Sequence, residues 1–455
     1  MVRRIVTCIL CLLAVVAVGQ DKVALERFLQ TEGLTNAAIG ISLKRVTDGK
    51  VKIEYCADMA LTPASVTKLI PTWLALKEKG IDYCYSTTVF YTGTIRGGIL
   101  SGDILIRAAG DPCLESRYFP NHLFMDTLVK AIVKAGIREI KGKIIVEGGK
   151  VGMDIPGSWT WEDVSNYYAA LYLPFNYRDN TYTLIFRSGE AGQTAQIISV
   201  KPPLPGIRII SEVIASGQRD NAWIFGGPYS SVLCVKGSIP PNQSSFKIKG
   251  AMHNPAAAFS NELMIALTGK GISVENTVGE KKTLTKLFVI HSPCLEEIVY
   301  RTNKFSVNLF AEALGKLVGG EQWTRDVPEL LNRAGVANSG ITLRDACGLS
   351  PMDAVPADVF TNLLICAARE TGEPFVRSLP VAGVDAGLNG YCVAASTLKY
   401  RLKAKTGSMA GVRCLAGYLT ALSGEQFAFT LLINHYTCST AQLQQAVGKF
   451  LQAML

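Results

Sequence analysis

Three short motifs contain residue types that are suited to nucleophilic chemistry. The segment PASVTKLIP, residues 63–71, places Ser65 three positions before Lys68. A serine hydroxyl is a poor nucleophile until a base removes its proton. Because residues three apart on a helix share a face, Lys68 is a candidate for that base. The other two motifs lie far along the chain: FSVN, with Ser306 and Asn308, and AKTGSM, with Lys405, Thr406, Gly407 and Ser408.

The Ser-x-x-Lys spacing alone does not identify a nucleophile, because it occurs three times. Ser244 and Ser396 also precede a lysine by three residues. Ser244 lies in a region of short β-runs, and Ser396 lies just upstream of Lys-Thr-Gly without a helix start around it. Only Ser65 opens an apolar helix and precedes both companion motifs, so we take Ser65 as the candidate nucleophile.

The companion motifs supply what a lysine base requires. Lys68 must be neutral to accept a proton, which requires a pKa lowered by burial and by a second cation. Lys405 is the candidate for that cation. Ser306 and Asn308 can hydrogen-bond to Lys68 and to a substrate amide, and Ser306 can pass a proton to a leaving amine. Taken singly, these residues also fit plain structural roles: Ser65 as a helix N-cap, Ser306 as a surface residue and Lys405 as a solvated charge.

The third motif predicts how a substrate backbone is held. Gly407 has no Cβ, so an extended substrate can approach the strand edge there. The backbone N–H groups of Ser65 and Ser408 can form an oxyanion hole. The order Ser-x-x-Lys, Ser-x-Asn, Lys-Thr-Gly is typical of the serine acyl-transferases that penicillin inhibits.

Hydrophobic periodicity places these motifs on an α/β framework with an antiparallel sheet. The apolar residues after Pro63 predict a helix that ends at Gly80 and is kinked or divided at Pro71. The Lys-Thr-Gly motif is expected just before an edge strand, and Ser-x-Asn on or beside a helix. Further predicted elements are strands around the turn 47–49, a strand within 142–149, a strand pair turning at 423–425, and helices near 122–135, 257–271 and 440–455.

The first residues have the pattern of an export signal. Arg3 and Arg4 form a positive start, and the apolar run 5–18 is too short to span a bilayer comfortably. Small residues precede a suitable cleavage point before Gln20. We therefore predict a signal peptide over 1–19 and no transmembrane anchor in the exported protein, with a retained anchor as the less favoured alternative.

Composition narrows the function classes. Of the 455 residues, 48% are hydrophobic and 18% charged, which is typical of a globular protein of two or three domains. The net charge of +9 suits an anionic cell envelope, or simply solubility, and no basic stripe indicates nucleic-acid binding. Beyond the signal, the cysteines lack Cys-x-x-Cys spacing and the four histidines are scattered, so we expect no metal and no cofactor.

The sequence resembles the class C low-molecular-mass penicillin-binding proteins, the D-alanyl-D-alanine carboxypeptidases and endopeptidases of the S13 peptidase family. The resemblance covers nearly all of the chain after the signal, and it includes GILSGDILIRAAGDP (98–112) and DACGLSP (345–351). It implies an α/β (α+β) fold: a β-lactamase/transpeptidase-like domain, with an antiparallel sheet flanked by helices, interrupted by two smaller domains. The implied boundaries are 20–85 and 290–455 for the catalytic domain, 86–187 and 251–289 for domain II, and 188–250 for a β-rich domain III nested in the insertion.

The resemblance also implies roles for single residues. It makes Ser65 the acylated serine and Lys68 its base. Asp163 and Tyr168, in WTWEDVSNYY, are implied to bind the free amino group of the peptide's diamino acid, although Asp163 also fits a surface carboxylate. The remaining implied residues are Ser306, Asn308 and Lys405 for catalysis, and Thr406, Gly407, Ser408 and Met409 for substrate binding.

Two departures from the family pattern accompany these motifs. Val307 replaces the usual aspartate between Ser306 and Asn308, a change that activity is expected to survive. In DACGLSP, Ala346 and Cys347 replace the family's usual glycine and serine, and Pro351 replaces a residue that is often basic. The sequence therefore does not predict how this loop contacts the substrate.

Together these features predict a serine DD-peptidase that cleaves D-alanyl-D-alanine or D-alanyl crosslinks through an acyl-enzyme on Ser65. Peptidoglycan stem peptides and β-lactam antibiotics would be its partners, in the periplasm or cell envelope. A β-lactamase and a non-catalytic peptidoglycan-binding protein on the same fold are the alternatives. The sequence leaves open carboxypeptidase against endopeptidase preference, crosslink chemistry, disulfide pairing and whether the protein forms a homodimer.

Overall fold

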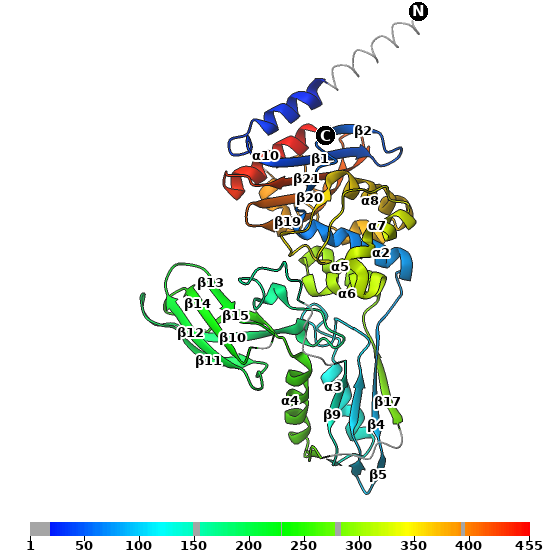
Figure 1. The fold of residues 1–455 in the computed structure, drawn as a ribbon, viewed down its shortest axis with the longest axis vertical. Helices are drawn as coiled ribbons and strands as arrows, with labels where there is room; N and C mark the ends of the chain where they lie inside the picture. The colour runs from blue at the N-terminus through cyan, green and yellow to red at the C-terminus, as the bar shows by residue number, and fades with distance from the viewer. Residues whose placement is uncertain (1–18, 149–154, 229, 278–283, 393–395) are drawn as a thin grey trace, which may run out of the picture. The chain divides into compact units, whose positions relative to one another are not determined.

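The computed structural model describes residues 19–148, 155–228, 230–277, 284–392 and 396–455 (Figure 1). The predicted signal peptide lies, except for its last residue, outside this range. The chain forms two compact units. Unit 1 contains the residues up to Ile81, Val299–Ser306 and Leu314–Leu455, and unit 2 contains Asp82–Ile298 and Val307–Ala313. Among the described helices, none combines the length and apolar character that a membrane span needs.

Unit 1 is built around a five-stranded antiparallel sheet in the order β19-β20-β21-β1-β2. Its strands are β1 (Ala38–Arg45), β2 (Val51–Tyr55), β19 (Leu402–Met409), β20 (Val412–Thr420) and β21 (Gln426–Asn434). A separate short pair joins β3 (Ala60–Leu61) to β18 (Val355–Pro356). The first and last parts of the chain therefore share one sheet, and both predicted strand pairs are confirmed.

Helices cover both faces of this sheet. Successive residues of a strand point to opposite sides, so each strand contributes side chains to both interfaces. On one face, Ile41 and Leu43 of β1 share a core with Leu443 and Phe450 of α10 (Thr440–Ala453). The predicted C-terminal helix is thus confirmed, and its apolar side packs on the sheet. Figure 1 shows α10 running beside β1.

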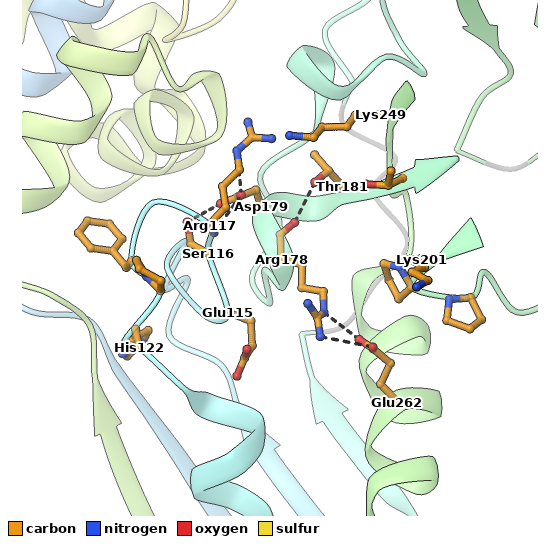
Figure 2. Close-up of a pocket in the computed structure, with 15 residues that line it drawn as sticks. Glu115, Ser116, Arg117, His122, Arg178, Asp179, Thr181, Lys201, Lys249 and Glu262 are labelled. Atoms are coloured by element: carbon orange, nitrogen blue, oxygen red, sulfur yellow. Dashed lines mark hydrogen bonds and ion pairs between the residues drawn. The ribbon is translucent and has the colours of Figure 1, made fainter. Parts of the chain in front are cut away.

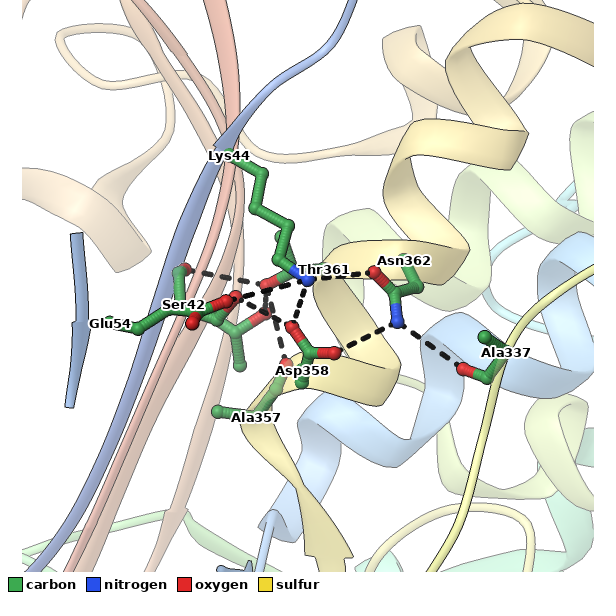
Figure 3. A network of polar contacts seen from close by, with 9 residues as sticks. Ser42, Lys44, Glu54, Ala337, Ala357, Asp358, Thr361 and Asn362 are labelled. Carbon is green, nitrogen blue, oxygen red and sulfur yellow. Dashed lines mark hydrogen bonds and ion pairs between the residues drawn. The ribbon is translucent and has the colours of Figure 1, made fainter. Parts of the chain in front are cut away.

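The other face is covered by α8 (Ala357–Glu370), which a polar network ties to β1 (Figure 3). Lys44 forms an ion pair with Asp358 and donates a hydrogen bond to Asn362 Oδ1 at 3.2 Å. Ser42 Oγ donates to Asp358 Oδ1 at 3.1 Å. These contacts fix the position of α8 on the sheet.

The segment after Pro63 is divided, but between Lys68 and Leu69 and not at Pro71, which corrects the predicted position. A 3₁₀ helix, η1 (Ala64–Lys68), is followed by α2 (Leu69–Lys79), which ends at Gly80. Pro71 lies in the first turn of α2, where backbone N–H groups have no acceptor within the helix. The proline is therefore accommodated within α2 without costing a hydrogen bond.

The remaining helices of unit 1 are η4 (Gly320–Gln322), α7 (Trp323–Arg333), α9 (Glu373–Ser378) and η5 (Ala386–Tyr391). Residues 19–29 are also helical. Two helices have residues in both units, α5 (Leu295–Phe305) and α6 (Asn308–Gly319).

Unit 2 combines small sheets with two helices around one hydrophobic core. The helices are α3 (Phe124–Lys134) and α4 (Pro255–Thr268), and α4 ends before Gly271, the predicted stop. The sheets have the orders β17-β4-β7-β9, β16-β8-β6-β5, β11-β10-β15 and β12-β14-β13. The division of this region into domains II and III remains a prediction.

The strands and short helices of unit 2 are β4 (Ser86–Thr92), β5 (Thr94–Arg96), β6 (Ile99–Ser101), β7 (Ile104–Arg107), β8 (Glu139–Ile140), β9 (Ile144–Glu147), η2 (Tyr167–Ala169), η3 (Arg178–Asn180), β10 (Thr181–Arg187), β11 (Gln196–Lys201), β12 (Arg208–Ala215), β13 (Asn221–Phe225), β14 (Val232–Ile239), β15 (Phe246–Ala251), β16 (Ser273–Val274) and β17 (Leu284–His291).

Candidate active site

Ser65 and Lys68 lie on η1, so Ser65 precedes the α-helix instead of lying in its first turn, as the sequence had suggested. Lys68 Nζ donates a hydrogen bond to Ser65 Oγ at 2.8 Å. Ser65 is partly exposed, whereas Lys68 is completely buried. Ala64 just before the serine has a left-handed φ of +46°, which is unfavourable for a non-glycine residue. A partly exposed hydroxyl is therefore paired with an amine that is shielded from water.

The loop 345–350 supplies a second contact to Lys68. The carbonyl oxygen of Cys347 accepts a hydrogen bond from Lys68 Nζ at 2.5 Å. The loop is held by the carboxylate of Asp345, which accepts hydrogen bonds from the backbone N–H groups of Cys347, Gly348, Leu349 and Ser350. The contact with the Cys347 carbonyl could not be predicted from the sequence, because a backbone acceptor has no residue-type signature. The aspartate and glycine of DACGLSP were the only hints in the sequence that this segment forms a tight loop.

Lys405 and Ser306 form a second lysine–serine pair in unit 1. Lys405 Nζ donates to Ser306 Oγ at 2.9 Å and to the carbonyl oxygen of Thr406 at 2.7 Å. Ser306 lies between α5 and α6 and has a left-handed φ of +55°. Lys405 is 1% exposed, and its burial, followed by the nearby charge of Lys68, holds its pKa well below the ordinary value.

The Lys-Thr-Gly motif lies inside β19 rather than before it, which corrects the predicted position. This strand is the edge of the sheet, as expected, and it pairs with β20 on its inner side. On its outer side the backbone of Pro380 and Ala382 bonds to Ala404 and Leu402. Within the described part of the chain, no strand pairs with the outer edge beyond Ala404.

Gly407 is required by packing within the protein. A Cβ on Gly407 would lie 2.5 Å from the carbonyl oxygen of Pro63 and 3.1 Å from the nitrogen of Val66. β19 therefore approaches η1 more closely than any residue with a side chain allows. Ser408 follows, exposed, with its hydroxyl bonded to Arg413, and the strand ends at a half-buried Met409.

Three further candidate residues are connected within unit 2. The hydroxyl of Tyr168 donates to Asp163 Oδ1 at 2.8 Å, and Thr160 Oγ1 donates to Asp163 Oδ2 at 2.6 Å. Burial, and then the hydrogen bond to Asp163, raise the pKa of Tyr168. Asn308, the first residue of α6, donates to the carbonyl oxygen of Tyr168 at 2.7 Å. A continuous chain of contacts thus links Asp163 through Tyr168 to Asn308 within unit 2.

Comparison with known proteins identifies the family. A family model described as the D-Ala-D-Ala carboxypeptidase 3 (S13) family matches residues 22–454. The chain belongs to this family. Proteins that it resembles include the D-alanyl-D-alanine carboxypeptidase DacB of Haemophilus influenzae, 24% identical over 431 residues, which are 89% of this chain and 87% of that protein. The D-alanyl-D-alanine carboxypeptidase of Actinomadura sp. (strain R39) is 26% identical over 451 residues, 91% of this chain and 80% of that protein.

The fold agrees with this membership. The crystal structure of penicillin-binding protein 4 (dacB) from Haemophilus influenzae matches with a TM-score of 0.77 and 22% identity, covering 93% of this chain and 97% of that chain. A second crystal structure of that protein, in complex with a β-lactam, matches with a TM-score of 0.72. The predicted family and fold class are confirmed. As an S13 peptidase, the protein is a serine-type D-alanyl-D-alanine carboxypeptidase, a hydrolase.

Proposed function

We propose that Ser65 is the nucleophile of an exported DD-peptidase acting on peptidoglycan stem peptides. The observation that carries this assignment is the 2.8 Å hydrogen bond between Ser65 Oγ and the buried amine of Lys68. A neutral Lys68 takes the hydroxyl proton while Oγ bonds to the carbonyl carbon of the penultimate D-alanine. The carbon–nitrogen bond then breaks, D-alanine leaves, and water hydrolyses the ester on Ser65.

The second lysine–serine pair is suited to the departure of the amine. Ser306 Oγ accepts from Lys405 Nζ, so its own proton is free to be donated to the leaving nitrogen. Lys405 can restore that proton, because a buried lysine with a lowered pKa gives up a proton more readily than an exposed one. The pair thus passes a proton from Lys405 through Ser306 to the leaving nitrogen.

The outer edge of β19 is proposed to hold the substrate backbone. An extended peptide pairs with an open strand edge through main-chain hydrogen bonds. Thr406 and Gly407 lie on this edge strand, and the N–H groups of Ser65 and Ser408 are the proposed oxyanion donors. Met409, at the end of the strand, is proposed as a further substrate contact.

The substrate's free amino group is assigned to the residues linked in unit 2. Asp163 supplies a carboxylate, and Tyr168 orients it through the 2.8 Å hydrogen bond. Asn308 is proposed to contact the substrate amide, and its bond to Tyr168 connects this motif with the acid. The side chain of Val307 is buried at 7% exposure, which agrees with a packing role at that position.

Covalent labelling by penicillin tests the nucleophile. β-Lactams acylate serine DD-peptidases, and a β-lactam is bound in one solved structure of Haemophilus influenzae penicillin-binding protein 4. We expect one penicillin adduct on the intact protein by mass spectrometry, mapped to the peptide with Ser65, and no adduct on Ser65→Ala. An unlabelled wild-type protein, or a labelled Ser65→Ala variant, overturns the assignment. Rapid release of hydrolysed penicillin would instead indicate a β-lactamase.

The reaction products decide between carboxypeptidase and endopeptidase action. Purified sacculi treated with the enzyme release free D-alanine in the first case and separate crosslinked peptides in the second. We propose that this chemistry takes place in the periplasm or cell envelope, after removal of residues 1–19. Cell fractionation followed by N-terminal sequencing checks both the location and the cleavage point.

A further inference from the structure

Unit 2 contains a polar pocket that is lined by none of the residues assigned above to catalysis or substrate binding (Figure 2). Its volume is about 510 Å³, within the range that proteins use for small ligands. Its walls come from the loop before α3, from η3, from the sheet β11-β10-β15 and from α4. The pocket is large enough for a peptide fragment, not only for a single ion.

Strand register places two lysines in one row at this pocket. Thr183 of β10 is paired with Lys201 of β11 on one side and with Lys249 of β15 on the other. Directly opposed residues in antiparallel strands share a face, with Cβ atoms about 4.5–5.5 Å apart. The neighbours of Thr183 on β10, Tyr182 and Leu184, point into the core on the other face. The register therefore places Lys201, Thr183 and Lys249 on the same face of the sheet, the face that lines the pocket.

Two acidic residues of the pocket already pair with other residues that line it. Glu262 forms an ion pair with Arg178 at 3.0 Å, and Asp179 lies 3.5 Å from Arg117 Nε and accepts from the hydroxyl of Ser116. By contrast, in the described residues no hydrogen bond or ion pair involves the side-chain amine of Lys201 or of Lys249. These two lysines therefore remain available to an anionic ligand.

The guanidinium of Arg117 adds a second positive charge beside Lys249 in the pocket. Figure 2 shows the Lys249 side chain reaching toward the guanidinium of Arg117. Partial burial, and then this guanidinium, lower the pKa of Lys249, while the carboxylate of Asp179 acts in the opposite direction. Two cations close together are unfavourable unless anions compensate them, and among the described residues Asp179 is the one carboxylate that acts on both. The pocket side chains comprise four basic and three acidic residues, so one positive charge is uncompensated.

The backbone around the pocket is strained in the same way as at the nucleophile. Glu115, Arg178 and Asp179 all have left-handed φ values, of +54°, +53° and +56°. Ala64 and Ser306, beside the catalytic serine and lysines, also have positive φ. Non-glycine residues in this region persist only where the surrounding structure holds them, and they concentrate at functional sites.

We propose that this pocket binds the free carboxylate of a peptide, held between Lys201 and Lys249 with the hydroxyl of Thr183 and with Arg117. A single uncompensated positive charge matches a carboxylate better than a doubly charged phosphate. Lys201, Thr183 and Lys249 bind the carboxylate of the peptide. The rest of the pocket volume accommodates the peptide residues that precede this carboxylate. The identification of the ligand as a peptidoglycan stem peptide rests on the proposed function, whereas the anion site itself does not.

Calorimetric titration of the Ser65→Ala protein tests the proposal, because catalysis is then absent and binding alone is measured. The probes are an N-acetylated tripeptide that ends in D-alanyl-D-alanine, its C-terminal amide, and inorganic phosphate. Lys249→Gln removes one lysine of the row. Lys247→Gln is the matched control, because it removes the same charge from the same strand at a residue that does not line the pocket.

We expect the acid to bind at two sites, and Lys249→Gln to weaken one of them about tenfold, as expected for a lost charge-assisted bond. Lys201→Gln, on the neighbouring strand, should weaken the same site, while Lys247→Gln changes it less than twofold. Equal binding of the acid and the amide, or no difference between Lys249→Gln and Lys247→Gln, overturns the proposal. Tighter binding of phosphate than of the tripeptide overturns the carboxylate assignment. Failure of the proposed function is a separate result, namely the absence of penicillin labelling on wild-type protein.

Discussion

The carbonyl oxygen of Cys347 accepts a hydrogen bond from Lys68 Nζ at 2.5 Å, on the same amine that donates to Ser65. The bond depends on the backbone of residue 347 and not on its side chain. A cysteine in place of the family's usual serine therefore leaves this contact intact. The loop's departure from the family pattern is compatible with the Ser65–Lys68 pair, because Asp345 still fixes the loop backbone.

Gly348→Ala is predicted to damage this site. Gly348 has a φ of +74°, and an added Cβ would overlap the carbonyl group of Ala64, next to the nucleophile. The loop must then move away from η1, which breaks the bond between Cys347 and Lys68. We expect at least a tenfold loss in the rate of acylation by penicillin, together with lower stability by more than the roughly 1–3 kcal/mol of backbone strain alone.

Gly424→Ala is the control that separates the effect of backbone strain from the effect of steric overlap. Gly424 has a φ of +89°, but a Cβ there meets no atom within 4 Å. This variant should lose stability only through strain and should be acylated at the wild-type rate. If the two alanine variants are acylated equally fast in stopped-flow measurements, the loop does not position Lys68.

Lys405 is predicted to make stability depend on pH. Burial and the charge of Lys68 lower its pKa in the folded protein, while the unfolded chain keeps the ordinary value of about 10.4. Between these two pKa values the unfolded state binds more protons, so the free energy of unfolding rises with pH, by at most about 1.4 kcal/mol per pH unit. Below the lowered pKa, and again above about pH 10, this contribution is constant.

The comparison is between wild type and Lys405→Met in urea denaturation from pH 6 to 9. We expect the difference in the free energy of unfolding, wild type minus Lys405→Met, to increase as the pH increases. Lys403→Met, which removes a half-buried lysine from the same strand, is the control and should run parallel to wild type. A difference between wild type and Lys405→Met that does not change with pH contradicts the prediction.

The sequence predicted those features that depend on neighbours in the chain. The hairpin between β20 and β21 and the stop at Gly80 follow from local periodicity and backbone preferences. The division of the helix before Gly80 was also expected, although it falls at Lys68 and Leu69 and not at Pro71. The spacing of Ser65 and Lys68 likewise suggested that they meet, because one helical turn brings them together.

What the sequence did not predict depends on long-range packing. Nothing local shows that Gly407 must approach Pro63, or that the carbonyl of Cys347, 279 residues away, bonds to Lys68. The row of Lys201 and Lys249 beside Thr183 is likewise set by strand register across three strands, which no single segment specifies. Such contacts appear only once the fold is known.

The network between β1 and α8 is predicted to stabilise unit 1. Lys44, with 12% of its side chain exposed, bonds to Asp358 and Asn362 (Figure 3). Lys44→Ala leaves the partly buried Asp358 without this cation, and we expect a loss of about 1–3 kcal/mol in the free energy of unfolding. Lys50→Ala, at an exposed position on the turn after β1, should change it by less than about 0.5 kcal/mol. Equal urea midpoints for the two variants would show that the network contributes nothing.

Asp163→Asn is predicted to change substrate preference. Asparagine keeps an oxygen that can accept from the hydroxyl of Tyr168, but it has no charge for a substrate ammonium group. For a stem peptide with a free side-chain amine, we expect KM to rise about tenfold, because a charge-assisted bond is replaced by a neutral one. The same peptide with that amine acetylated should be processed equally by wild type and variant.

Glu162→Gln, at the exposed neighbouring position, removes the same charge and should leave both substrates unaffected. Release of D-alanine, followed as a function of peptide concentration, gives KM and kcat for each enzyme and peptide. A loss in Asp163→Asn that is equal for the free and the acetylated peptide would falsify the proposed recognition of the amine. That outcome would indicate that Asp163 acts through Tyr168 and its bond to Asn308, as a positioning residue, because a structural role does not distinguish a charged substrate from a neutral one.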